Sequence, residues 1–231
     1  MKKYVLAFLV AAAFASCDDG RIYDEEAPSA STGRSVTMKA TIDGSVDYAY
    51  LSGYSVALAA FGDDDYALVS KPVGDGEVEV TLSGLPSAAR TVEVCLISRL
   101  RERLYTFASV DMDEVAAADM SFDAGSIDVG MYATVASGIF AARCAQCHGA
   151  TGHSAAGLDL VSDSSWDSLV GVPSAVVDGA SRVVPYDADA STLWQAVATG
   201  VSSGWAFNHA ALLTDRDKDF IKDWINSGAE R

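Results

Sequence analysis

Basic residues are scarce in this chain of 231 residues, which has 16 lysines and arginines against 32 aspartates and glutamates. The formal net charge is −16 at pH 7. A protein that binds nucleic acid needs a basic surface to neutralise phosphates, so this composition argues against a nucleic-acid partner. The excess of acidic residues either keeps the chain soluble or attracts a basic partner protein, and composition alone leaves both interpretations open.

Several common cofactor and nucleophile motifs are also missing. The chain contains no phosphate-binding loop, no serine nucleophile elbow, and no Gly-x-Gly-x-x-Gly between a strand and a helix. Hydrophobic residues nevertheless make up 50% of the chain, so a packed core is expected and extensive disorder is not.

Residues 1–16 have the pattern of an export signal. Two lysines precede an apolar run from Tyr4 to Phe14, which is too short to remain in a bilayer as a permanent anchor. The run ends in Phe14-Ala15-Ser16-Cys17, which resembles the lipobox of bacterial lipoproteins. That resemblance implies that Cys17 is lipidated and tethers the protein to a bacterial membrane, on the periplasmic or cell-surface side. Ordinary signal cleavage nearby is the alternative, and it exports the protein as well.

Residues 17–34 then continue from the lipidated cysteine as a polar stretch, which predicts a flexible tether. From 35 to 129, apolar and polar residues alternate in short runs separated by Gly- and Asp-rich breakers, a pattern typical of half-buried strands. Six or seven such strands predict an antiparallel β-sandwich of immunoglobulin or fibronectin type. The alternating positions are Val36, Met38, Ala40, Ile42, Val56, Leu58, Ala60, Val78, Val80, Leu82, Val92, Val94 and Leu96.

The pattern changes near Gly130, and helices are expected from there to residue 231. Residues 131–143 are rich in alanine, with apolar residues at helical spacing, and a shorter helix is expected over 191–199. Thr214-Asp215-Arg216-Asp217 resembles a capping box, and Gly228 is a plausible stop. Between them lies one apolar stripe, which predicts a C-terminal helix: Phe220, Ile221, Trp224 and Ile225.

The strongest chemical signal is the motif Cys144-Ala145-Gln146-Cys147-His148. In Cys-x-x-Cys-His the two thiols bind haem covalently and the histidine supplies an axial nitrogen to the iron. The motif therefore predicts one haem c. A zinc site would need a further Cys/His pair, and a thioredoxin-like redox pair would need a βαβ setting. Cys95 remains as a buried structural thiol, unless the four cysteines form two disulfides.

Around this motif, residues 130–231 resemble class I cytochrome c domains, in particular the small domains in multidomain proteins of planctomycetes and Bacteroidetes. The matching residues are Gly138, Phe140, His148-Gly149, Gly157-Leu158-Asp159-Leu160, Arg182-Val183-Val184-Pro185, Ser191-Thr192-Leu193-Trp194 and Trp224-Ile225-Asn226-Ser227-Gly228-Ala229.

The resemblance implies an all-α class I cytochrome c fold as the second domain, over 130–231. In that fold the helix before the haem motif crosses the C-terminal helix, where Gly138 would permit close approach. It also implies that Leu158 and Leu160 line the haem face. Arg182 and Trp194 would contact the haem propionates.

The chain departs from this family at the second axial ligand of the iron. Family members commonly supply a methionine from the loop before the C-terminal helix, but no methionine follows Met131. His209 lies in the corresponding loop and is the predicted distal ligand, with His148 as the proximal ligand. His153 is only five positions after His148, which favours a place on the proximal side or at the rim. The remaining alternatives are an open or water-filled distal side, and ligation by His153 or another group.

His/His ligation predicts a low reduction potential and an electron carrier that converts no substrate, working with a redox partner protein. An iron with an open distal side would instead suit a haem-based gas sensor or a peroxidase. A third hypothesis is a surface-binding lipoprotein whose β-sandwich carries the activity and whose haem is structural.

Overall fold

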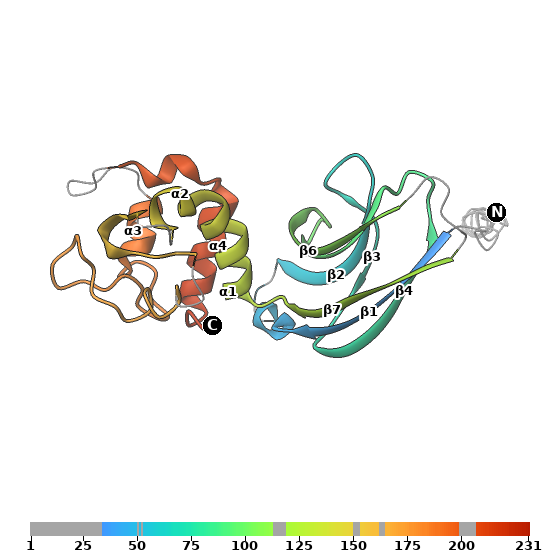
Figure 1. Cartoon of the computed structure of the whole chain (residues 1–231), viewed down its shortest axis with the longest axis horizontal. Helices are drawn as coiled ribbons and strands as arrows, with labels where there is room; N and C mark the ends of the chain where they lie inside the picture. The colour runs from blue at the N-terminus through green and yellow to red at the C-terminus, as the bar shows by residue number, and fades with distance from the viewer. Residues whose placement is uncertain are drawn as a thin grey trace, which may run out of the picture. The chain divides into compact units, whose positions relative to one another are not determined.

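The computed structural model describes residues 34–49, 51, 53–112, 119–149, 153–161, 165–198 and 207–231. Strands form the first part of the described chain, and helices and turns follow them up to the C-terminus (Figure 1). The predicted signal, Cys17 and the tether lie outside the described residues. Residues 33–231 form one compact unit.

The strands form two sheets. In the three-stranded sheet, β1 (Arg34–Asp43) lies between β4 (Gly76–Leu85) and β7 (Asp119–Asp128). The four-stranded sheet has the order β3 (Ala67–Pro72), β2 (Tyr54–Phe61), β5 (Thr91–Ser98) and β6 (Arg103–Asp111).

One strand pair differs from the expected antiparallel arrangement. β7 pairs with β1 in parallel, from Ser35 opposite Asp119 to Asp43 opposite Asp128. β6 and β7 belong to different sheets, so the chain passes from one sheet to the other instead of turning back in a hairpin. β7 therefore runs in the same direction as β1. The prediction of a wholly antiparallel sandwich is wrong for this pair.

Alternation along β1 explains the core of the sandwich. Val36, Met38, Ala40 and Ile42 are buried, while the residues between them are more exposed. In β2 and β5 nearly every residue is buried, so both faces of these central strands are covered. Cys95 lies in a separate small cluster with Ala57, Ala59, Phe61, Ala67 and Ile97.

Helical structure begins directly after the strands. A continuous helical stretch consists of α1 (Met131–Thr134), the π-helix η2 (Val135–Cys144) and α2 (Ala145–His148). The other helices are α3 (Thr192–Ala198) and α4 (Asp215–Asn226). Three short 3-10 helices and a short strand complete the elements: η1 (Ser45–Tyr48), η3 (Ala155–Gly157), η4 (His209–Leu212) and β8 (His153–Ser154).

The prediction of a C-terminal all-α class I cytochrome c fold is wrong. The structure is 41% strand and 27% helix, and its helices are short. Between α2 and α3 the described residues form β8, turns and isolated bridges, among them Val170 with Val183 and Ser181 with Ser191. This stretch is rich in Gly, Ser and Asp and lacks an apolar stripe at helical spacing, so turns and bridges satisfy its backbone hydrogen bonds.

The start and the buried face of α4 agree with the sequence pattern. The Thr214 hydroxyl accepts a hydrogen bond from the Asp217 amide at 3.1 Å. The Asp217 carboxylate accepts one from the Thr214 amide at 2.9 Å, so the predicted capping box is confirmed. The predicted apolar stripe is buried along its length: Phe220, Ile221, Trp224 and Ile225.

Candidate haem-attachment site

The two cysteines of the motif lie at the junction of two helical segments. Cys144 is the last residue of η2, and Cys147 lies one turn later in α2. The Cys144 side chain is half-buried against the hydrophobic core, whereas Cys147 is exposed. Burial, together with the nearby charges of Asp217 and Cys147, raises the pKa of Cys144 to about 11. Cys144 is therefore a protonated thiol at neutral pH, unlike the low-pKa cysteine of a thioredoxin-like pair.

The imidazole rings of His148 and His209 lie next to each other although they are far apart in sequence. His148 ends α2 and His209 begins η4. Their ring centres are 6.1 Å apart and their planes are inclined by 32°. An ion bound by one nitrogen of each ring at about 2 Å, with each nitrogen about 1 Å from its ring centre, would separate the centres by about 6 Å. The observed spacing thus fits one metal ion between two axial imidazoles.

The buried Nδ1 atom of His148 and the pKa of His209 agree with this spacing. His148 Nδ1 is buried and has no hydrogen-bond partner among the described residues, which is costly for a polar atom in a folded protein. The pKa of His209 is lowered, chiefly by burial and then by the neighbouring His148. Lowering the pKa favours the neutral imidazole, which is the form that ligates a metal.

The segment after the motif folds back onto it. The Leu160 amide donates a hydrogen bond to the His148 carbonyl at 2.8 Å. Leu160 is buried, and Leu158 packs against the same core cluster. The predicted haem-lining leucines therefore lie on a segment that is attached to the proximal histidine.

Arg182 holds this segment in place. Its guanidinium donates to the carbonyl of Ser168 at 2.7 Å and to those of Ala156 and Gly157 at 3.2 and 3.3 Å. Those two carbonyls immediately precede Leu158. This role could not be predicted from the sequence, because no sequence pattern indicates which distant backbone carbonyls an arginine will contact.

Trp194 lies on α3 and is partly buried. Lys222 of α4 places its ammonium 5.0 Å from the centre of the Trp194 ring, a cation–π contact that joins the two helices. The propionate contacts that the resemblance implied for Arg182 and Trp194 stay predictions.

Phe207 is a neighbour of the site that the sequence analysis did not single out. Its ring meets the His209 ring nearly edge to face, with centres 5.4 Å apart. The Phe207 side chain is 52% exposed. An aromatic residue two positions before the predicted ligand was the available signal.

Some parts of the site lie outside the described residues, namely 150–152, 199–206 and the side chain of His153. Among the residues that are described, no three or more His, Cys, Asp and Glu side chains gather as ligands of one ion. No helix in the described part of the chain is long and apolar enough to cross a membrane.

Comparison of the chain with protein-family models, with curated proteins and with solved structures gave no match.

Proposed function

We propose that the protein is an exported monohaem c-type cytochrome that transfers single electrons. Haem c would be attached through Cys144 and Cys147, and its iron would be ligated by His148 and His209. The observation that carries this proposal is the 6.1 Å spacing of the two imidazole rings. A chance pair of structural histidines has no reason to keep this spacing directly beside a Cys-x-x-Cys-His motif.

A bound haem supplies one-electron redox chemistry, and the chain decides which chemistry is available to it. Two imidazoles would occupy both axial positions, which leaves no position for a gas or a peroxide. Leu158 and Leu160 would contribute an apolar surface beside the His148 ring, and an apolar surround also tunes the potential. Ligation by two histidines in place of a methionine favours a low potential.

The proposal also includes the location and the partner. Lipid on Cys17 would tether the protein to a bacterial membrane, on the periplasmic or cell-surface side. A net charge of −16 would favour a redox partner with a basic surface.

Covalent attachment is the first test of this proposal. The full chain is expressed in a host that matures c-type cytochromes, then denatured, and its mass is measured. We expect the mass of one haem to remain with the wild-type chain and to be lost in the Cys144→Ser, Cys147→Ser double variant, because the motif then has no thiol to bind the vinyl groups.

Cys95→Ala is the matched control for this experiment. Cys95 is fully buried outside the motif, with its Sγ 3.7 Å from the Ala57 carbonyl oxygen, so its loss should leave haem attachment intact. A wild-type chain that carries no haem after denaturation contradicts the proposal.

A further inference from the structure

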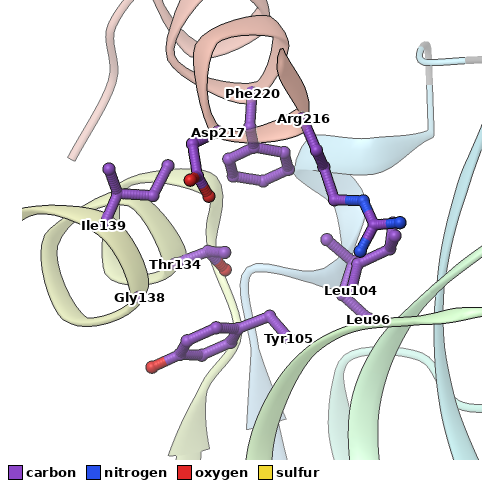
Figure 2. A pocket seen from close by; sticks show the side chains of 9 residues that line it. All are labelled: Leu96, Leu104, Tyr105, Thr134, Gly138, Ile139, Arg216, Asp217 and Phe220. Atoms are coloured by element: carbon purple, nitrogen blue, oxygen red, sulfur yellow. The ribbon is translucent and has the colours of Figure 1, made fainter. Parts of the chain in front are cut away.

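The π-helix η2, which ends at Cys144 of the haem motif, contacts β6 of the sandwich at Gly138. A Cβ atom added to Gly138 would lie 2.5 Å from Cε2 and 2.6 Å from Cδ2 of Tyr105. Figure 2 shows the Tyr105 ring beside the helix that carries Thr134 and Gly138. Gly138 does permit close approach, but to an aromatic ring of β6. The expectation that it also serves the crossing with the C-terminal helix stays a prediction.

Gly138 and Cys144 lie in the same π-helix. A contact that fixes the rotation of this helix at Gly138 therefore also fixes the direction of the Cys144 side chain. The π winding is visible in the hydrogen bond from the Ala145 amide to the Phe140 carbonyl. An α-helix turns by about 100° per residue, whereas a π-helix, with i→i+5 hydrogen bonds, turns by less. The difference accumulates between Gly138 and Cys144. If the segment were an α-helix that kept the contact between Gly138 and Tyr105, the Cys144 side chain would point in a different direction from the one observed.

The surrounding contacts keep this helix from rotating. Tyr48 of η1 shares a hydrogen bond of 2.9 Å with Thr134, and Thr134 immediately precedes the π-helix. Tyr54 of β2 donates a hydrogen bond of 3.0 Å to Asp223 of α4. Arg216 of α4 also forms an ion pair with Glu102. Residues from the strands therefore hold both helical elements next to the motif.

The packing at Tyr105 is close but not complete. A cavity of about 60 Å³ lies beside it, between β5, β6, η2 and α4. The residues that line it are Leu96, Leu104, Tyr105, Thr134, Gly138, Ile139, Arg216, Asp217 and Phe220 (Figure 2). If the Tyr105 ring were removed, this space would grow, and the helix would lose the surface against which Gly138 is seated.

We propose that Tyr105 is a positioning residue for haem attachment. Its ring packs against Gly138, which fixes the rotation of the π-helix about its axis and so sets the direction of the Cys144 thiol. The sandwich is then part of the attachment site and more than a spacer. This inference rests on the proposed function, because it concerns the direction of the thiol that would bind haem.

The first test needs no haem. Amide hydrogen exchange is measured on the full chain made without haem maturation, for wild type, Tyr105→Ala and Tyr105→Phe. We expect Tyr105→Ala to speed exchange of the amides of residues 138–144 by about tenfold, because this part of the π-helix loses the ring against which it packs. Tyr105→Phe keeps the ring and should exchange as the wild type does. Tyr66→Ala is the control, since Tyr66 is 51% exposed and does not line the cavity.

The second test uses the haem-loaded chain. We expect Tyr105→Ala to reduce the fraction of chains that keep haem after denaturation and to shift the reduced absorption band, since one thioether bond would form poorly. Tyr105→Phe should restore both. If Tyr105→Ala does not fold, Gly138→Ala replaces it, because its added methyl group must displace the ring or the helix.

The outcomes separate this inference from the proposed function. Wild-type exchange rates in Tyr105→Ala, together with normal haem attachment, overturn the role of Tyr105 while the proposed function stands. If the wild-type chain takes up no haem, the proposed function is wrong. The role of Tyr105 in haem attachment is then wrong as well, whatever the hydrogen-exchange rates are.

Discussion

The chemistry of single residues in this site depends on burial. Burial lowers the pKa of His209 and raises that of Cys144, so both side chains are neutral at physiological pH. Neutral imidazoles can ligate iron without first losing a proton. The ring of His209 lies beside that of His148, with their centres 6.1 Å apart.

Replacing His209 tests this ligand directly. In a haem-loaded His209→Ala chain the iron loses its sixth ligand, so we expect a high-spin spectrum and tight binding of carbon monoxide. His209→Met should restore a low-spin spectrum with a higher reduction potential, because methionine ligation raises the potential. Both are measured by absorption and redox titration.

His153→Ala is the control for this substitution, since it removes the alternative ligand and should leave the spectrum unchanged. An unchanged spectrum in His209→Ala would show that another group ligates the iron.

Elements differ in how far their sequence determines them. The capping box and apolar stripe of α4 are local signals, because hydrogen bonds and burial along one helix depend on residues three and four apart. The alternation in β1 and β4 is a local signal too, because it repeats at every second residue, whereas β2 and β5 are buried on both faces. The parallel pairing of β7 with β1 depends on how the chain passes between two sheets, which no local pattern records.

The π winding of η2 was also beyond sequence reasoning. Its residues have the apolar spacing of an ordinary helix, and the contact between Gly138 and Tyr105 joins segments that are distant in the chain. Residues 130–231 were expected to form an all-α fold, but the described residues between α2 and α3 form turns and bridges because they lack a helical stripe. Within the candidate site, the proximity of the His148 and His209 rings could be predicted, whereas the carbonyl contacts of Arg182 could not.

α4 also supports a prediction of stability. The Trp224 ring is buried against Tyr132, with ring centres 5.3 Å apart, and its indole nitrogen donates to the Glu230 carbonyl at 2.9 Å. We expect Trp224→Ala to lower the free energy of unfolding by about 3–5 kcal/mol, because it leaves a large cavity in the core. Trp194→Ala should cost less, since Trp194 is only partly buried.

Denaturant unfolding of the haem-free chains measures both variants, because bound haem would add its own stabilisation. Equal losses in Trp224→Ala and Trp194→Ala would contradict the packing described for α4.

At the scale of the whole molecule, the strands and the helical segments share one hydrophobic cluster that extends from Val36 to Ala229. The two histidines of the candidate site come from α2 and η4, which are far apart in the sequence. The protein as a whole must therefore fold before His148 and His209 can meet. The two cysteines and His148, by contrast, are already close together in sequence.

The measurement that tests the central claim most directly is the absorption spectrum of the haem-loaded wild-type protein, oxidised and reduced, before and after adding carbon monoxide. Ligation by His148 and His209 predicts a low-spin spectrum without a methionine–iron band and with little response to carbon monoxide. A high-spin spectrum that shifts when carbon monoxide is added would contradict the account, because the distal side would then be open to a ligand.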